Sequence, residues 1–323
     1  MTAEYQSLTV AECADRLLVL PDRVKVLLHI RPDGDTVGSG AALCELLRLL
    51  GKEAELYSPD KIPQRLEFLT EGITLSDTPE GCAAVSIDVA SPSQLGNSYG
   101  RADIHLTIDH HERNTPYAPN LTLGDKSSAG EVLYTVVKEL ISRGLVTMTE
   151  ALAMRLYAAI SSDTGRFAYS NCSPDTHRAA AQLMEYGFDS SRVNRLLFDS
   201  KTKNQIKAEG LVASLMKTSP DGRITYAAVS LSDMEAAGIA FPDLETGIDV
   251  VRSLMGCEVS FIIKELCDGG MKVSLRSTGK DVSAIAVKHG GGGHIRAAAC
   301  TLTGISIKEA TEVLLCECEK LFG

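Results

Sequence analysis

Short apolar runs alternate with helical patterns through the first half of the chain, and this alternation constrains the fold more than any other feature. Aliphatic and β-branched runs of strand length occupy 24–30, 82–88 and 103–109. Helical apolar spacing occupies 36–51, 131–142, 149–161 and 175–186. Strands that alternate with helices predict an α/β fold with a doubly wound, mostly parallel sheet.

The second half of the chain has a different pattern. Residues 191–217 are helical in pattern, charged and low in glycine, so we interpret them as a helical linker between domains 1–190 and 218–323. The runs GRITYAAVS, CEVSFIIKEL and GMKVSLRS then alternate in the manner of strands. A helix, a glycine loop and a further strand are expected to complete a smaller, mixed α/β domain.

Composition excludes several classes of protein. With 323 residues, 44% of them hydrophobic, the chain is long enough to bury a substantial core, and no apolar run is long enough to span a bilayer. Nine cysteines without a C-x-x-C pair indicate reduced thiols, and we expect a cytoplasmic protein. A net charge of −10 argues against a protein that grips long duplex nucleic acid.

Acidic and histidine side chains gather where the predicted strands end. In an open α/β sheet, ligands bind at the carboxyl ends of the strands, and a turn after the helix at 149–161 can return to the same edge. Like charges that converge in one cleft are costly unless cations neutralise them. The candidate residues are His29, Asp33, Asp35, Asp88, Asp109, His110, His111 and Asp163.

The donor types indicate which cations would bind. Carboxylates and imidazoles without thiolate suit Mn²⁺, while Mg²⁺ and Co²⁺ are possible. The set is larger than one ion requires, so we expect two ions per site, about 3.5 to 4 Å apart and sharing a carboxylate. Such a pair is the clamp that phosphoesterases use, and it explains how Asp33 and Asp35 tolerate each other.

Four segments together resemble the motifs of the DHH phosphoesterase superfamily. They are HIRPDGDTVGSG, SIDVAS, TIDHHERN and SSDTGRF, and GGGGHIRAAAC resembles the glycine-rich signature of the DHH-associated C-terminal domain. Size and spacing are similar to the nanoRNase members. The resemblance implies a metal-dependent hydrolase that degrades oligoribonucleotides of about 2 to 5 nucleotides. It also implies removal of the 3′-phosphate of adenosine 3′,5′-bisphosphate (pAp).

The resemblance also implies a role for each motif residue. His29, Asp33 and Asp88 would hold one metal, and Asp35, Asp88, His110 and Asp163 the other, so that Asp88 bridges them. The ions would activate a water for direct attack on phosphorus, without a covalent enzyme intermediate. His111 would face the scissile phosphate as a hydrogen-bond or proton donor. For Asp109, ligating a metal and orienting a ligand are both open.

The C-terminal domain is expected to capture the substrate. Backbone N–H groups of a glycine loop can cradle a phosphate, and arginine can bind phosphate through two parallel hydrogen bonds. Where the family pattern usually ends in Ala-Ala-Gly, this chain has Ala298-Ala299-Cys300, so the local backbone can differ. The expected binding residues are Arg276, Ser277, Gly291, Gly292, Gly293, His294 and Arg296.

Several alternatives remain open from sequence. Relatives of this length hydrolyse cyclic dinucleotides such as c-di-AMP or the linear product pApA, and an inactive hydrolase would be a nucleotide sensor. A manganese pyrophosphatase would lack the glycine-histidine signature. A processive exonuclease would need many aromatic side chains for bases to stack on, whereas this chain is 5% aromatic and has no tryptophan. The expected binding partners are therefore short RNA or small nucleotides, and binding to a membrane is not expected. A homodimer is suggested by the resemblance alone.

Overall fold

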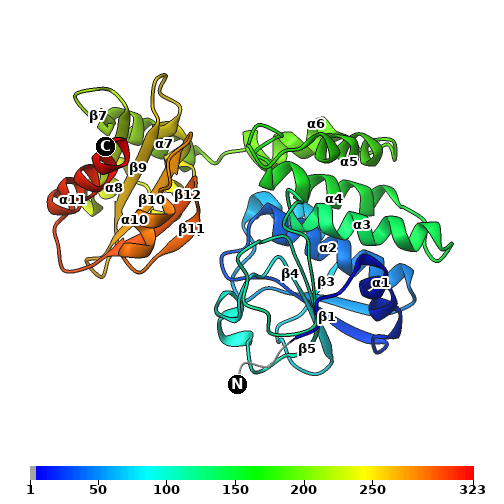
Figure 1. Ribbon diagram of the computed structural model, residues 1–323. Coiled ribbons are helices and arrows are strands. Elements are labelled where there is room, and N and C mark those ends of the chain that lie inside the picture. The colour runs from blue at the N-terminus through cyan, green and yellow to red at the C-terminus, as the bar shows by residue number, and fades with distance from the viewer. Residues whose placement is uncertain (1–4) are drawn as a thin grey trace. The chain divides into compact units, whose positions relative to one another are not determined.

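The chain folds into two compact units. The computed structural model describes residues 5–323. The first unit ends at Ser200 and the second comprises Lys201–Gly323. In Figure 1 the first unit runs from blue to green and the second from yellow-green to red. No helix among the described residues is both long and apolar enough to cross a membrane.

The first unit is built on six parallel strands in the order β3-β2-β1-β4-β5-β6. The strands are β1 (Arg23–Leu27), β2 (Glu53–Tyr57), β3 (Thr74–Leu75), β4 (Ala83–Ile87), β5 (Asp103–Asp109) and β6 (Asn120–Thr122). β1 pairs with β2 on one side and β4 on the other, so the strand order reverses between β1 and β4. The predicted parallel α/β sheet is confirmed, and this reversal is where such sheets bind ligands.

Helices of the first unit pack their apolar side chains into one core with the sheet. They are α1 (Val10–Val19), α2 (Gly34–Leu49), α3 (Ala129–Ser142), α4 (Glu150–Asp163), α5 (Pro174–Met184) and α6 (Ser190–Asn194). Short 3₁₀ segments are η1 (Gln64–Thr70) and η2 (Pro92–Ser98), and η3 (Arg195–Asp199) is a π-helical segment. On the other face of the sheet, Leu27 and Ala84 pack with Leu95 of η2 and with Tyr117.

Helix starts in this unit follow from their capping residues. The side chains of Asp33, Ser128, Thr149 and Ser173 each accept a hydrogen bond from the first turn of the helix that follows. Such caps satisfy backbone N–H groups that have no partner within the helix. α2 and α3 therefore begin two residues earlier than their apolar patterns at 36–51 and 131–142 indicate.

The second unit contains a mixed sheet in the order β11-β12-β10-β9-β8-β7, in which only β8 and β9 run parallel. The strands are β7 (Lys217–Thr218), β8 (Ile224–Val229), β9 (Val259–Glu265), β10 (Met271–Ser277), β11 (Gly292–His294) and β12 (Ala297–Leu302). The helices are α7 (Lys203–Leu215), α8 (Leu231–Ala237), α9 (Gly247–Arg252), α10 (Ser283–Lys288) and α11 (Ile307–Glu319), with η4 (Phe241–Leu244) and η5 (Lys320–Phe322).

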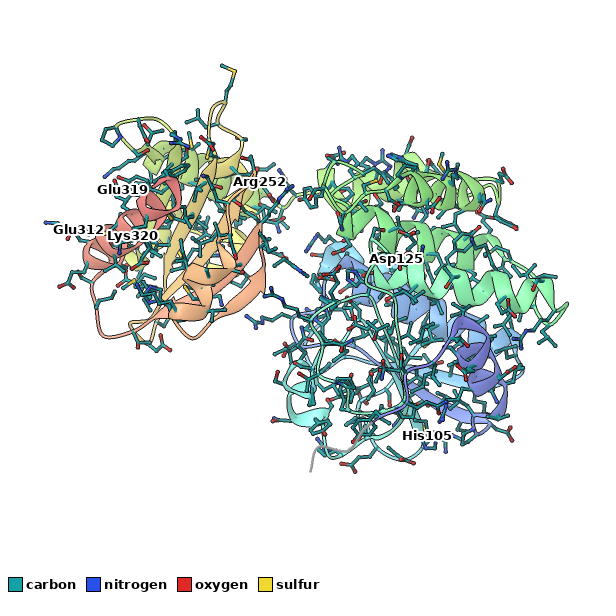
Figure 2. The ribbon with its side chains drawn as sticks, viewed as in Figure 1. His105, Asp125, Arg252, Glu312, Glu319 and Lys320 are labelled. Atoms are coloured by element: carbon teal, nitrogen blue, oxygen red, sulfur yellow. The ribbon has the colours of Figure 1, made fainter. Side chains whose placement is uncertain are left out.

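Two apolar clusters lie on opposite faces of the second sheet. Phe261 and Ile263 of β9 pack with α10 and α11, whereas Ile262 between them packs with α7, α8 and α9. Alternate residues of a strand point to opposite faces, which accounts for this division. Figure 2 shows Glu312 and Glu319 of α11 on one side of this sheet and Arg252 of α9 on the other.

The segment 191–217, predicted to be a linker, is divided between the two units. α6 and η3 end the first unit, while α7 packs on β8 and α9 of the second. Ala208 and Val212, one helical turn apart, bury their side chains in the second unit. α7 is therefore part of a core, and the division between units falls between Ser200 and Lys201.

Candidate active site

Three neighbouring strands bring histidines and aspartates to one edge of the first sheet. His29 lies two residues after β1, Asp88 directly follows β4, and Asp109 is the last residue of β5. His110 and His111 come immediately after it. β1, β4 and β5 are adjacent in the sheet, so these side chains meet at the reversal of strand order. His105, in the first half of β5, pairs with Asp103 and lies toward the bottom of the unit in Figure 2.

Two further aspartates are positioned by helix starts. Asp33 caps α2 by accepting hydrogen bonds from the backbone N–H groups of Asp35 and Thr36. Asp35 is buried in the first turn of α2, and its two carboxylate oxygens accept from the N–H groups of Ala129 and Gly130 at 2.7 and 3.0 Å. These two residues begin α3, so a helix N-terminus stabilises the Asp35 charge.

Asp163 is the last residue of α4. The helical pattern at 149–161 ends before Asp163, whereas α4 continues for two further residues, and the backbone N–H of the capping residue Thr164 donates to the carbonyls of Ile160 and Ser162. The side-chain amide of Asn171 donates to the Asp163 carboxylate at 3.2 Å and to its carbonyl at 3.1 Å. The same amide reaches the carbonyl of Ser127 at 3.0 Å, so Asn171 holds Asp163 beside the start of α3.

His29, Asp33 and Asp88 form the first group of donor atoms. His29 Nε2 lies 3.8 Å from Asp33 Oδ1 and 3.5 Å from Asp88 Oδ2. Donor atoms of these three side chains all lie within 4.8 Å of one another. Such separations suit ligands of one cation, since each ligand atom of a divalent transition metal sits about 2.0 to 2.2 Å from the ion.

The second group forms around His110. His110 Nε2 lies 3.6 Å from Asp88 Oδ1, and 3.9 Å from both Asp35 Oδ2 and Asp163 Oδ2. Asp35, His110 and Asp163 also have donor atoms within 4.8 Å of one another. Asp88 thus directs one carboxylate oxygen toward each histidine, as a carboxylate that bridges two cations would.

Both histidines present the same nitrogen to these groups. His29 Nδ1 lies 2.8 Å from the carbonyl of Ile30, and His110 Nδ1 lies 3.4 Å from the carbonyl of Lys126. A ring N–H donated to a carbonyl leaves the opposite nitrogen unprotonated for a metal. Backbone carbonyls therefore orient both rings with Nε2 available as a ligand.

The buried acids of the site lack enough positive charge. Burial and the charge of Asp33 raise the pKa of Asp88, and burial with the charge of Asp88 raises that of Asp35 well above its usual range. Burial and Asp33 raise the pKa of Asp163 to about 7. Asp88 Oδ1 is buried with no hydrogen-bond donor among the described residues. This donor set fits a divalent cation, which would satisfy that oxygen and neutralise the acids.

His111 has a different environment from the other two histidines. Its Nδ1 lies 2.7 Å from Asp109 Oδ1, and the same oxygen accepts the backbone N–H of His110. Burial lowers the pKa of His111, but the hydrogen bond and charges of Asp109 and of nearby acids outweigh it and raise the pKa to about 9. Asp109 therefore orients His111, which carries a proton at neutral pH and can donate it or a hydrogen bond.

The backbone at Asp88 is strained. Its φ of 60° lies in the left-handed region, which non-glycine residues seldom adopt. The N–H of Asp88 donates to the carbonyl of Ile108 at 2.9 Å, which ties this conformation to β5. Strain of this kind often accompanies a functional residue because the surrounding structure must hold it in place.

In the second unit, Arg276, Gly292 and His294 share one face of the sheet. Arg276 lies opposite Ala297, which lies opposite His294, and Gly292 lies opposite Ala299 two residues along β12. Ser277 ends β10, and its N–H donates to the carbonyl of Arg296 at 3.0 Å in the β11–β12 turn. The residues expected to bind substrate are therefore close in this unit, except that the Ser277 hydroxyl bonds to the Lys280 carbonyl.

The glycine segment differs from the open loop that the sequence predicts. Gly292–His294 form β11, an edge strand paired with β12. A Cβ at Gly291 would lie 2.1 Å from the Ala299 carbonyl oxygen, and one at Gly293 would lie 2.4 Å from that of Ala297. These two glycines allow two strands to approach closely. At Gly292, by contrast, a Cβ would meet nothing within 4 Å, so its surface is open.

Sequence reasoning missed or left undecided some of these features. Neither the hydrogen bonds of Asn171 to Asp163 nor the contact between Asp35 and the start of α3 follows from the sequence alone. Ser128 followed three residues later by Glu131 is a spacing typical of a helix start, and it could have indicated that α3 begins there. Arg166, which follows Asp163 closely in sequence, forms an ion pair with Asp199 at 2.7 Å.

This combination of fold and site defines a class of protein. Residues 23–160 match the family model described as DHH family, N-terminal domain, and residues 221–320 match the DHHA1 domain. Together with the relatives below, these matches show that the chain belongs to the DHH family, in the group that carries a DHHA1 domain.

Individual relatives cover nearly the whole chain. The bifunctional oligoribonuclease and PAP phosphatase NrnA of Thermus thermophilus is 33% identical, over 94% of this chain and 91% of its own length. The protein of that name from Bacillus subtilis is 27% identical, over 93% and 95%. An exopolyphosphatase-related protein of Bacteroides fragilis has the same fold, with a TM-score of 0.87 at 20% identity over 96% of both chains.

Proposed function

We propose that this protein is a metal-dependent phosphoesterase that hydrolyses short oligoribonucleotides and removes the 3′-phosphate of pAp. The observation that carries the proposal is the pair of donor groups that meet at Asp88. Relatives named as bifunctional oligoribonucleases and PAP phosphatases match this chain over more than nine-tenths of its length. Short RNA and small nucleotides are then its substrates.

Two Mn²⁺ ions per site are the proposed cofactor, with Mg²⁺ or Co²⁺ as substitutes. His29, Asp33 and Asp88 would hold one ion, and Asp35, Asp88, His110 and Asp163 the other. Divalent cations bound there would stabilise charge on the phosphate and make a water more acidic. Mixed oxygen and imidazole donors without thiolate support this choice of metal.

The remaining residues have distinct proposed roles. His111 donates a hydrogen bond or proton to the phosphate or leaving oxygen, and Asp109 keeps its ring oriented and protonated. Asn171 positions Asp163. In the second unit, the guanidinium group of Arg276 and the open surface at Gly292 are the best-supported contacts for a nucleotide phosphate. Gly291, Gly293, His294, Ser277 and Arg296 shape the same region.

Cyclic dinucleotide hydrolysis is a less well supported activity. Cyclic-di-AMP phosphodiesterase GdpP of Geobacillus thermodenitrificans is 28% identical over 92% of this chain, but the match covers only 47% of that protein. This chain is closer in length to the NrnA proteins. A nucleotide sensor on an inactive site is disfavoured because every expected donor residue lies in one of the two groups.

A substrate panel tests the proposal. Release of products from pAp, pApA, a five-nucleotide RNA and c-di-AMP is compared by kcat/KM in the presence of Mn²⁺. We expect preference for pAp and the linear substrates, and no activity in an Asp88→Asn control. Preference for c-di-AMP would instead make the protein a cyclic dinucleotide phosphodiesterase, and binding without any cleavage would indicate a sensor.

A further inference from the structure

The backbone that follows Asp163 takes a left-handed course. Gly165, Arg166 and Phe167 have φ values of 54°, 61° and 63°, so three successive residues lie in the left-handed region. Glycine adopts this conformation readily, whereas other residues rarely do so, and then as single residues. We refer to residues 165–167 as the left-handed turn. Such strain persists only where the surrounding structure holds it, so the contacts of the turn show what holds it.

Thr164 holds the start of the turn. It is fully buried as the capping residue of α4, and its hydroxyl accepts a hydrogen bond from the N–H of Phe167 at 3.1 Å. Its carbonyl accepts hydrogen bonds from the N–H groups of Ala168 and Tyr169, both at 2.9 Å. These hydrogen bonds close the turn and connect it to the buried end of α4.

The side chain of Phe167 holds the end of the turn. Its ring centroid lies 5.7 Å from that of Tyr157 on α4 and 5.5 Å from that of His177 on α5, on which it stacks. The ring is partly buried against the core of the first unit. Packing against α4 and α5 therefore fixes the conformation of this residue.

The side chain of Arg166 contacts a different element, η3. Its guanidinium group lies 4.7 Å from the ring centroid of Phe198 and forms an ion pair with Asp199 at 2.7 Å. Both partners belong to η3, and π-helical segments of this kind are frequent at functional sites. The Arg166 side chain is 44% exposed, so each contact is modest, but both act on a residue whose backbone is strained.

The direction of the turn determines where Asn171 lies. The chain leaves Asp163, passes through the left-handed turn and returns, so that the Asn171 amide donates to the carboxylate and the carbonyl of Asp163. A right-handed course at 165–167 would send residues 168–171 in another direction, because the backbone angles of three residues change together. The hydrogen bonds that hold Asp163 in the donor group around His110 therefore depend on the turn.

We propose that Arg166 is a positioning residue: its contacts with η3 hold the left-handed turn, and the turn keeps Asp163 in place to bind a cation. The inference rests on the proposed function, because the donor group around His110 must hold a metal for the position of Asp163 to matter. The donor group around His29 contains no residue of α4 or of the turn. Loss of the contacts between Arg166 and η3 should therefore weaken one of the two cation sites and spare the other.

Two substitutions at position 166 separate these contacts from the backbone strain. Arg166→Ala removes the contacts with η3 but keeps a non-glycine residue in the left-handed region, whereas Arg166→Gly removes both the contacts and the strain. In titration calorimetry of the metal-free full-length chain with Mn²⁺, we expect Arg166→Ala to weaken one of two sites by about fivefold or more. Arg166→Gly should weaken that site clearly less, and the other site should keep its wild-type affinity in both variants.

Two further variants distinguish positioning from a general effect on the fold. Asp199→Asn breaks the ion pair without changing the turn, and it should weaken the same site in the same direction even if Arg166→Ala does not fold. Arg178→Ala is the control, because it breaks an ion pair with Asp175 on α5 in which both side chains are exposed, and it should bind Mn²⁺ as the wild type does. Equal losses in Arg166→Ala and Arg166→Gly, or equal losses at both cation sites, would exclude the positioning role while the hydrolase proposal stands.

Hydrogen exchange tests the hold on the turn without metal. The N–H groups of Ala168 and Tyr169 bond to the Thr164 carbonyl, so their exchange rates report whether the turn is closed. In the metal-free chain, both should exchange about fivefold faster or more in Arg166→Ala than in the wild type and in Arg166→Gly. Unchanged rates would overturn the inference. A wild type that binds no Mn²⁺ would overturn the proposed function, and these rates alone would then decide whether Arg166 holds the turn.

Discussion

At the scale of single residues, Asp88 must satisfy two demands. Its carboxylate lies within 3.6 Å of both His29 Nε2 and His110 Nε2, and its backbone adopts a left-handed φ of 60°. Asparagine tolerates that backbone conformation better than most residues. Asp88→Asn is therefore a substitution that removes charge with little change in backbone conformation.

Asp88→Asn is expected to abolish hydrolysis of every substrate, by about a thousandfold or more in kcat, because both cations would lose a charged ligand. Metal content measured after gel filtration should fall with it. Asp109→Asn is the comparison, since Asp109 contacts His111 and should lower kcat while metal content is retained. Near-normal turnover in Asp88→Asn would contradict the two-cation arrangement.

Asn171 is expected to affect the metal without touching it. Asn171→Ala removes the amide that holds the Asp163 carboxylate at 3.2 Å, so Mn²⁺ affinity should fall about 10- to 100-fold. Titration calorimetry with Mn²⁺ measures this change, and excess metal should restore kcat. Asn114→Ala serves as the control, because the Asn114 amide bonds to Thr122. Unchanged Mn²⁺ affinity would limit Asn171 to a structural role.

At the scale of elements, the edge strand β11 contains one glycine that the close approach of two strands requires and one whose surface is open. Gly293 has a φ of 137° and faces the Ala297 carbonyl oxygen, whereas the position of a Cβ at Gly292 is open. Gly293→Ala should lower the free energy of unfolding by roughly 1 to 3 kcal/mol. Gly292→Ala should leave stability unchanged and raise KM for pAp. Urea unfolding and steady-state kinetics on both variants distinguish these effects.

Strand β9 carries a prediction about pH. Burial and the charge of Lys272, its cross-strand partner on β10, lower the pKa of Lys264 to about 8 in the folded protein, against about 10.5 in the unfolded chain. Between these values the unfolded chain binds more protons, so the stability of the wild type rises as pH increases from 8 to 10. Lys264→Met should thus be more stable than wild type at pH 7, by roughly 1 to 3 kcal/mol, and lose that advantage by pH 10. A constant difference across this range would show that Lys264 is not perturbed.

The sequence predicts where strands and helices lie along the chain better than it predicts which side chains meet in the folded protein. The strand at 103–109 matches β5, and those at 24–30 and 82–88 extend β1 and β4 by one to three residues, because apolar runs and turns are local signals. The donor residues follow from the carboxyl ends of those strands. The contact of Asp35 with α3 and the opposition of Lys264 to Lys272 depend on helix packing and strand register, which arise from residues distant in sequence.

At the scale of the whole molecule, each unit has its own apolar core. Calorimetric unfolding should therefore contain two transitions, of which only that of the first unit responds to metal. Mn²⁺ at a hundredfold excess over its Kd should stabilise this unit by about 2.7 kcal/mol per site, and chelation should remove that gain. An upward shift of both transitions, or of neither, would contradict a metal site confined to the first unit.

The donor residues are spread along most of the first unit, from His29 after β1 to Asp163 at the end of α4. During synthesis, a chain that has emerged only as far as His111 holds the first donor group but lacks Asp163, its positioning amide on Asn171 and the start of α3 that anchors Asp35. Complete metal loading must then wait until the ribosome has released α3 and α4. A hydrolytic activity that depends on the proposed cations would then be withheld from nascent chains until the first unit has been synthesised almost in full.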